Sequence, residues 1–538
     1  MPCVRNSRYA DGMDLGEIGR TLAERLRDWA GSGWSDAVLQ LSMGTSGSVA
    51  AWTDQPDQHN GRALIDILHG AYPQDRPPAA YEVQLRADGT YRFATSADAS
   101  TLAPVRFEFD PDFRCPQRPA PGMPRPAGIE PTSAPTDPAA VREVSALVEE
   151  FAERYTAITG HAPDWEPGRS EEEIAAAEAR IQARLPEDLR ALYRLIGWDS
   201  GETGLLGYYA HDSLDTVVEN YHYSLPGAYR GAAFDPPPHS ADVVFEAVPP
   251  SRIKRLSRND WWLSFGGNHS DQWIAVDLDP AEGGRSGQVI EHGDEVARLL
   301  ASSVTEMLAD VVAALRAGRF TRHEGDPRLE IQAAFHDVPY ENHVLLVRDV
   351  AKLDLAAEIS TEDPEVVQSC HLSDGIDVDL ATLEPLGGLR ELGAHRMRTV
   401  VPNVAGLPLL ESLTISAARV GLDALVGHPT LWDLTLHHLA HPVDLSPLAT
   451  LPNLTRLAID GLDIPAIDQL VQLKALRVLT LDATQLTRLL ATGHRLPQLA
   501  ALTITGRVLL AEAVGFLRQL RGADVHLEEF TGSLRPSD

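Results

Sequence analysis

Leucine and isoleucine recur at a short, regular interval over the last third of the chain. The pattern Leu-x-x-Leu-x-Leu/Ile starts at residues 410, 431, 454, 476 and 499, and a shorter copy starts at Leu389. Successive copies lie 21 to 23 residues apart. A unit of this length cannot bury its apolar residues alone, but stacked units form one continuous core. The pattern therefore predicts a solenoid of stacked repeats.

This repeat resembles the leucine-rich repeat, in which each unit adds one strand to a parallel sheet on a curved face. A degenerate copy at Val367, Cys370 and Leu372 extends the pattern backwards, so we interpret Cys370 as a small core residue. We expect an α/β leucine-rich repeat domain over residues 323–538.

Period-two geometry predicts which side chains the repeat sheet displays. If Leu434 and Leu436 point inward, their neighbours must point outward. The displayed candidates for partner binding are Asp433, Thr435, His437, Arg456, Asp460, Thr480 and Asp482. Three aspartates among them form a mildly acidic stripe that suits a basic protein. The alternative is that threonines are simply good strand formers and that solvated acids have no function.

The N-terminal part of the chain combines a helical pattern of apolar residues with several alternating segments. Leu15, Ile18, Leu22, Leu26 and Trp29 fall at helical spacing. Alternating segments at 38–43, 48–52, 81–86, 91–94 and 105–109 predict strands, with a hairpin at Asp88-Gly89. We expect a small α+β domain over 1–115. Prolines crowd residues 116–138 and hold the backbone extended, which predicts a linker.

The middle of the chain has the best helix signals. Val144 to Tyr155 are spaced as one helix that stops at Gly160, and Ser170 with Glu173 forms a capping box for a second. A third helix follows Pro186 and is predicted to stop at Gly197. Strands at 261–266 and 273–280 and a helix over 304–315 complete a second α+β domain over 139–322.

A more specific resemblance lies in the same region. Its motifs are Trp165, Ser170, Glu173, Leu185-Pro186-Glu187-Asp188-Leu189, Leu192-Tyr193, Trp262-Leu263-Ser264-Phe265-Gly266, Ile274-Ala275-Val276-Asp277-Leu278-Asp279-Pro280 and Gly287-Gln288-Val289-Ile290. In this order they resemble the SUKH superfamily of fungal cell-wall synthesis regulators, Syd proteins and bacterial immunity proteins. The resemblance implies a non-enzymatic binding domain, which in bacteria often neutralises a cognate toxin, frequently a nuclease.

Aromatic residues with polar tips cluster in the variable middle of this domain. Tyr208, Tyr209, Tyr221 and Tyr223 would make good interface anchors. The alternative reading is that half of them pack in the core. Trp261, Trp262 and Trp273 are expected to be core residues, because strand alternation points only some of them outward.

Charge narrows the choice of partner. The 46 Lys and Arg residues against 77 Asp and Glu give a net charge of −31, which repels nucleic acid and anionic membranes and attracts basic proteins. The alternative is that this acidity only keeps the protein soluble. The chain has 3 widely separated cysteines, no apolar signal segment and no stretch long enough to span a membrane, so we expect a protein of the reducing cytoplasm. The resemblance to bacterial immunity proteins implies a bacterial source.

No motif assembles into an active site, and we predict neither enzymatic activity, nor a cofactor, nor a metal site. His437, His438 and His441 alternate in direction on a strand and would not converge on a metal. His211 with Asp212 and Asp215, and His269 with Asp271, are acid-base pairs of a kind that any acidic protein offers by chance.

The leading hypothesis is an immunity-type protein that binds a basic toxin domain through the SUKH-like domain, with the repeats widening the contact. The main rival is an intracellular regulatory scaffold that joins partners through both domains. An enzyme within the N-terminal domain is a third reading.

Overall fold

The computed structural model describes residues 15–43, 48–54, 79–96, 99–102, 104–110, 112–120, 122–224, 242–247, 249–268, 272–293, 297–322, 329–336, 344–364, 366–521 and 525–534. They form two compact units. Unit 1 combines Met1–Phe113 with Leu346–Glu362 and Cys370–Asp538, and unit 2 combines Arg114–Leu345 with Asp363–Ser369. The sequence pattern divided the chain into consecutive segments, whereas the units join segments that are far apart along it.

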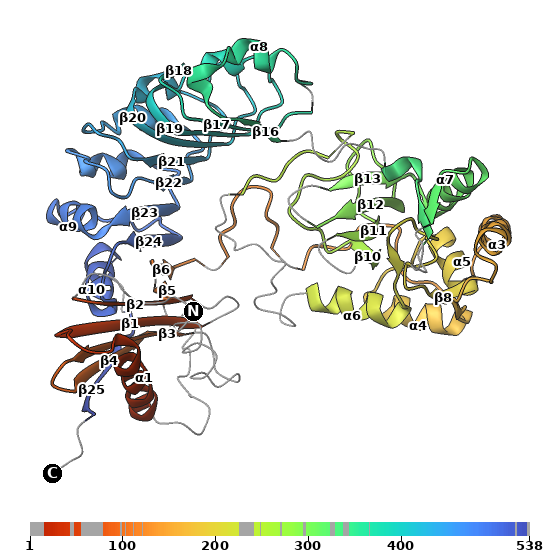
Figure 1. Cartoon of the computed structure of the whole chain (residues 1–538), viewed down its shortest axis with the longest axis horizontal. Helices are drawn as coiled ribbons and strands as arrows, with labels where there is room; N and C mark the ends of the chain where they lie inside the picture. The colour runs from red at the N-terminus through yellow and green to blue at the C-terminus, as the bar shows by residue number, and fades with distance from the viewer. Residues whose placement is uncertain are drawn as a thin grey trace. The chain divides into compact units, whose positions relative to one another are not determined.

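Unit 2 packs helices against one antiparallel sheet (Figure 1). The sheet has the order β13 (Arg298–Ala301), β12 (Gln288–His292), β11 (Trp273–Asp277), β10 (Trp262–Gly267) and β9 (Ala210–His211). The helices are α3 (Pro138–Thr159), α4 (Glu171–Ile181), α5 (Glu187–Leu195), α6 (Leu214–Ser224) and α7 (Val304–Arg316). Short pairs are formed by β7 (Glu166–Pro167) with β8 (Ile196–Trp198), and by β14 (Phe320–Arg322) with β15 (Leu329–Ile331), which precedes η1 (Ala334–His336).

The helix ends follow from local chemistry. Ser170 and Glu173 form the predicted capping box of α4, and Gly160 ends α3 in the left-handed conformation with φ of 89°. The prediction that the third helix stops at Gly197 is wrong. The helix α5 ends at Leu195, and Gly197 lies in β8, where an added Cβ would sit 2.5 Å from the Pro167 carbonyl oxygen. Gly197 is therefore required for strand pairing.

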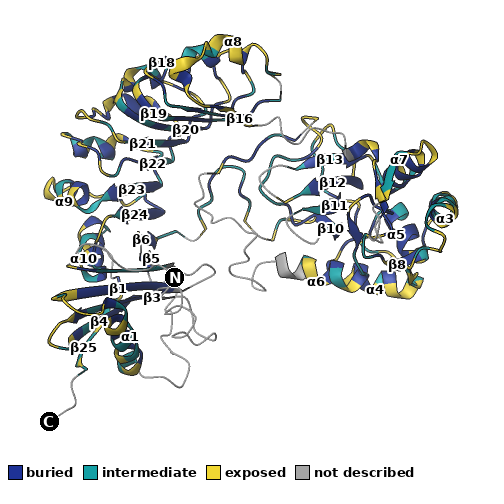
Figure 2. Ribbon diagram, viewed as in Figure 1, coloured by how far each residue is buried: buried dark blue, intermediate teal, exposed yellow. Residues whose placement is uncertain are grey.

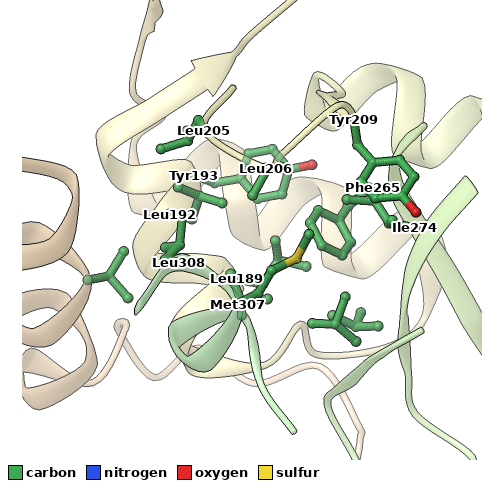
Figure 3. Close-up of a cluster of buried hydrophobic side chains, with 14 of the residues drawn as sticks. Leu189, Leu192, Tyr193, Leu205, Leu206, Tyr209, Phe265, Ile274, Met307 and Leu308 are labelled. Carbon is green, nitrogen blue, oxygen red and sulfur yellow. The ribbon is translucent and has the colours of Figure 1, made fainter. Parts of the chain in front are cut away.

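The core of unit 2 lies between the sheet and the helices. Figure 3 shows side chains from α5, α7 and the sheet meeting there, among them Leu192, Tyr193, Phe265 and Met307. All four are fully buried. Trp261 and Trp262 are buried as expected, whereas Trp273 is partly exposed.

The proline-rich segment before α3 belongs to unit 2. Asp260 accepts hydrogen bonds from the backbone N–H groups of Gly122 and Met123 at 2.6 and 2.8 Å, and the Trp261 indole donates to the Pro124 carbonyl oxygen at 2.9 Å. Extended backbone leaves its polar groups unpaired within the segment, so they pair with the neighbouring domain instead. The segment expected to be a linker thus runs along the surface of unit 2.

Unit 1 contains the repeats. Their strands run in chain order through β17 (Ser369–Ser373), β19 (Glu391–Val401), β20 (Ser412–Val420), β21 (Asp433–His437), β22 (Arg456–Ala458), β23 (Val478–Asp482) and β24 (Ala501–Thr505). Pairing is parallel from β19 to β24, and β18 (Asp377–Asp379) pairs with β19. β16 (Val344–Val347) spans the point where the two units divide. The strands line one side of the array (Figure 1), and Figure 2 shows that they are largely buried.

The opposite side of the array carries short helices. They are η3 (Val350–Lys352), α8 (Leu355–Ile359), η4 (Leu380–Leu383), η5 (Leu422–Leu425), η6 (Ser446–Thr450), η7 (Ile467–Gln472), α9 (Ala483–Ala491) and α10 (Leu510–Arg521). The repeat leucines fill the space between: Leu413, Leu434, Leu457, Leu479 and Leu502 each have 0% exposure. Cys370 is also fully buried, as expected for a core residue.

The N-terminal segment folds onto the C-terminal end of the repeats. The helix α1 (Leu15–Ala30) covers a sheet of order β2 (Ser48–Thr53), β1 (Asp36–Met43), β3 (Ala79–Arg86), β4 (Thr90–Ser96) and β25 (Glu528–Ser533). The hairpin of β5 (Ala99–Leu102) and β6 (Val105–Glu108) continues the repeat sheet, because β6 pairs antiparallel with β24.

A buried carboxylate fastens this junction. Glu82 has 0% exposure and accepts hydrogen bonds from the Gln40 amide and from the backbone N–H of Leu510, both at 2.7 Å. Leu510 is the first residue of α10, where backbone N–H groups have no partner within the helix. The strands β1 and β3 therefore contribute to a cap on the C-terminal end of the repeats.

Candidate interaction surfaces

Two surfaces gather the residues that the sequence marked for partner binding. The first lies on unit 2 around the loop between β8 and β9. Asp199 and His211 close this loop through paired backbone hydrogen bonds of 3.0 and 2.9 Å, and a second bridge joins Leu206 to Tyr209. Tyr208 lies next to this second bridge. The loop therefore holds its residues in a fixed conformation.

The two tyrosines of the loop have different roles. Tyr208 is 44% exposed, whereas Tyr209 has 0% exposure and points into the core (Figure 3). Tyr209 cannot be an anchor for a partner, because its ring fills the space beside Phe265 and Ile274. The prediction is therefore corrected for Tyr209, and Tyr208 remains a candidate.

A buried ion pair supports the exposed ring. Glu291 accepts hydrogen bonds from the Tyr208 hydroxyl at 3.0 Å and from the Arg298 guanidinium at 2.8 Å, and the Tyr209 hydroxyl also donates to it. Burial raises the pKa of Tyr208 well above its usual value, so the hydroxyl stays protonated. An aromatic side chain held in this way loses little entropy when a partner binds.

The other aromatic candidates lie elsewhere. Tyr221 is half-buried, with its ring 6.2 Å from that of Trp261, and the side chain of Tyr223 lies outside the described residues. Trp198 in β8 is 40% exposed, and sequence reasoning missed it. Its position directly after the predicted end of a helix was an available signal.

The second surface is the displayed face of the repeat strands. Thr435, Thr480 and His437 are partly exposed there, in line with the period-two prediction. The prediction that Asp433 is displayed to a partner is wrong, because its exposure is only 2%. The parallel register places Ser412 and Arg456 on either side of it, and they donate hydrogen bonds to its carboxylate at 2.7 and 2.6 Å.

The remaining acids of the proposed stripe also make internal hydrogen bonds. Asp460 accepts one from the Thr505 hydroxyl at 3.1 Å. Asp482 caps α9 through the backbone N–H of Gln485 and accepts a second bond from that of Gly461, both at 2.9 Å. Part of the negative charge predicted for this face is therefore used to hold the repeats together.

Histidines mark the other end of this face. The rings of His371 and His395 stack with centroids 5.8 Å apart over Gly393, where a Cβ would lie 2.5 Å from each ring. Among the residues that the structure describes, no group of three or more His, Cys, Asp or Glu side chains has a geometry that could hold a metal ion.

The first candidate acid-base group, around His211, does not form a solvent-exposed site. His211 is fully buried against Tyr193, with ring centroids 4.6 Å apart, and burial lowers its pKa to about 4. The Asp215 side chain is 87% exposed and pairs with Arg180. His269 and Asp271 lie outside the described residues. His211 is thus placed as a neutral core residue.

Replacing His211 with glutamine should make unit 2 less sensitive to acid. The folded pKa of about 4 lies below the ordinary value of 6.5, so the unfolded state takes up the proton first. Stability from this residue is complete above pH 6.5 and is lost as the pH falls toward 4, by about 2 kcal/mol between pH 7 and pH 5. Urea unfolding gives the free energy of unfolding at pH 7 and at pH 5. The decrease between these two pH values should be smaller by about 2 kcal/mol in the variant than in the wild type.

The exposed His161 provides the matched control, because His161→Gln makes the same substitution outside the core. Burial raises the pKa of Asp199 to about 6, which has the opposite sign and stabilises the fold on acidification. Identical pH dependence in wild type and His211→Gln would contradict the prediction.

Comparisons with known proteins give a family match and similar solved structures. Residues 168–310 match the model of the SMI1 / KNR4 family (SUKH-1). Among solved structures, an internalin (inlF) from Listeria monocytogenes is similar at 16% identity and a TM-score of 0.21, covering 29% of this chain and 46% of that one. Internalin C2 (inlC2) from the same organism is similar at 22% identity and a TM-score of 0.19, covering 26% of this chain and 72% of that one.

Among curated protein sequences, none matches the chain. The first internalin is thus matched over less than half of its own length. Of the helices in the described ranges, none has the length and apolar composition needed to cross a membrane.

Proposed function

We propose that this chain is a non-enzymatic protein-binding protein of the immunity type, which neutralises a cognate toxin, often a nuclease, in the bacterial cytoplasm. The observation that carries the proposal is the SMI1 / KNR4 family match over residues 168–310, which includes the loop bearing Tyr208. In this proposal residues 139–322 make the main contact, and the repeats within 323–538 widen it.

Charge and surface chemistry support a basic partner. The net charge of −31 steers a positively charged toxin domain toward the chain. Tyr208 and Trp198 are 44% and 40% exposed, and aromatic residues of this kind commonly dominate the binding energy of protein interfaces. We expect these two residues to be the anchors on unit 2.

Capture of partners tests the proposal. The tagged full-length chain is incubated with lysate of the source cells at low and raised salt, and bound proteins are identified by mass spectrometry. We expect a basic partner whose expression alone arrests growth and whose toxicity the full-length chain relieves. Alanine at both Tyr208 and Trp198 should weaken binding by roughly 10-fold or more, as for interface hot spots.

Val426→Ala is the matched control, because Val426 is an apolar residue of unit 1 that is 56% exposed. It should bind like wild type. If no captured protein is toxic, neutralisation is refuted.

A regulatory scaffold is the second candidate function. The observation that favours it is the separate surface on the repeat strands of unit 1, where Thr435, Thr480 and His437 are accessible. A scaffold would hold two different proteins, one through each unit. The test changes Thr435 and Thr480 to lysine in one variant and Tyr208 in another. If some partners are lost from the first variant but kept by the second, the scaffold function is favoured over neutralisation.

A further inference from the structure

The repeat sheet is irregular at β19 and β20, where the pairing register shifts between Ala394 and Met397. β19 and β20 continue past the point where the other repeat strands end, and Met397↔Ala417, Thr399↔Arg419 and Val400↔Val420 still pair. β18 pairs with this part of β19 on the other side. We call β18 with residues 397–401 and 417–420 the ledge.

The ledge has an open strand edge. β21 ends at His437, and its pairing with β20 ends at Ser416↔His437, so in the described part of the chain no strand pairs with residues 417–420 on that side. The carbonyl oxygen of Ala418 accepts a hydrogen bond from the backbone N–H of Ala440 at 3.0 Å, so the backbone of Ala418 faces this side. By the two-residue period of a strand, the N–H and carbonyl groups of Val420 face the same way.

A hollow of about 360 Å³ lies along this edge. Its walls are residues 418–423 on one side and Leu439, residues 441–444 and Pro447 on the other. Leu422, Val443 and Pro447 are buried and contribute apolar surface. The hollow therefore offers the backbone of Val420 at the edge of β20 and an apolar floor, which are the two parts of a site for an added strand.

The charges around the hollow favour a basic occupant. Asp423 and Asp444 are exposed on its walls. Hydrogen bonds from Ser446 and Gln469 hold the pKa of Asp444 below its usual value, so this carboxylate is charged at neutral pH. The one cation of the lining, Arg419, donates a hydrogen bond from Nε to Nε2 of His441 at 3.2 Å. Two carboxylates thus outweigh one guanidinium, within a chain of net charge −31.

We propose that an extended segment of a basic protein partner binds here as an added strand, pairing with the backbone of Val420 and placing a lysine or arginine side chain between Asp423 and Asp444. Main-chain hydrogen bonds supply the affinity and the carboxylates select the charge. This inference rests on the proposed function, because it names how the repeats widen the contact with a basic toxin.

Short synthetic peptides provide a direct test on the full-length chain. The probes are a peptide of alternating threonine and lysine, its glutamate counterpart, and the lysine peptide with alternate backbone nitrogens methylated. Fluorescence anisotropy measures binding, and hydrogen exchange locates it. We expect only the unmethylated lysine peptide to bind, with slower exchange of the amide of Val420.

Two variants and a control make the test specific. Val420→Pro removes the N–H group that faces the hollow and should abolish binding. The double change Asp423→Asn and Asp444→Asn keeps the hydrogen bonds to Ser446 and Gln469 but removes both charges, and should weaken binding by about 10-fold or more. Asp468→Asn removes an exposed charge outside the hollow and should leave binding unchanged.

Each other outcome overturns the inference. Equal binding of the lysine and glutamate peptides would refute the basic occupant, and binding of the methylated peptide would refute strand addition. Protection of amides elsewhere, or no binding at all, would refute the site. If a toxin is captured and neutralised equally well by Val420→Pro, this inference fails while the proposed function stands. If the peptide binds at the ledge but no captured protein is toxic, the proposed function fails instead.

Discussion

Removing residues 526–538 is expected to unfold the N-terminal sheet, although these residues lie more than 400 positions from most of it along the chain. The removed segment contains β25, which pairs with β4 over six residues from Glu528↔Thr95 to Ser533↔Thr90. Phe530 packs against Phe93 with ring centroids 6.1 Å apart. We expect the free energy of unfolding of unit 1 to fall by about 3–5 kcal/mol, the cost of removing a large aromatic side chain from a core.

The truncated protein should also aggregate, because β4 becomes an exposed edge of the sheet. Thermal unfolding with hydrogen exchange of β3 and β4 measures the effect. Two single substitutions form a matched pair on the same strand: Phe530→Ala, on the face toward the core, should be destabilising, and Thr531→Ala, on the exposed face, should change stability by under about 0.5 kcal/mol. If the amides of β3 and β4 exchange at wild-type rates in the truncated protein, the N-terminal sheet does not need β25.

Replacing Glu178 with alanine should be the most damaging single change in unit 2. Glu178 and Arg190 are 0% and 1% exposed, and their charged atoms lie 2.5 Å apart. Glu178 also accepts a hydrogen bond from the backbone N–H of Leu185 at 2.8 Å. The variant leaves a buried guanidinium with one of its carboxylate partners missing, which costs about 3–5 kcal/mol. Urea unfolding followed by tryptophan fluorescence measures the loss.

Arg190 keeps Thr136 and Glu171 as partners in that variant, at 3.2 and 2.7 Å. Their presence sets the expected loss toward the lower end of the range. Glu172→Ala, an exposed acid on the same helix, is the control and should cost under about 1 kcal/mol. Replacing Glu178 with leucine and Arg190 with methionine together should recover much of the stability, since an apolar pair needs no charge partner. If Glu178→Ala loses no more stability than the control, the ion pair of Glu178 and Arg190 contributes little to the stability of unit 2.

The tyrosine pair shows the limit of sequence reasoning at the candidate site. Tyr208 and Tyr209 are adjacent and chemically identical, so composition gives no basis for choosing between them. The bridge from Leu206 to Tyr209 sets the direction of the chain there and turns one ring into the core and the other toward solvent. The choice depends on packing against Phe265 and Ile274, which lie more than 50 positions away in the sequence.

Asp433 shows the same limit on the repeat face. Alternation along one strand correctly indicated that its side chain leaves the leucine core. Its exposure, however, depends on the cross-strand neighbours Ser412 and Arg456, and these are set by the register of three strands. A residue on the displayed side of a sheet is therefore not always accessible.

By itself, the sequence determined the elements whose signals are local or periodic: the leucine-rich strands, the capping box at Ser170, the helix end at Gly160 and the helical spacing of α3 and α7. These depend on side chains within a few positions of one another, or on a period that repeats the same local contacts. Only the tertiary structure decided that β25 completes the N-terminal sheet, that Glu82 meets the start of α10 and that β6 extends the repeat sheet. The physical reason is that backbone hydrogen bonds between strands are nearly the same for every sequence, so the partner of an edge strand is chosen by the packing of the whole unit.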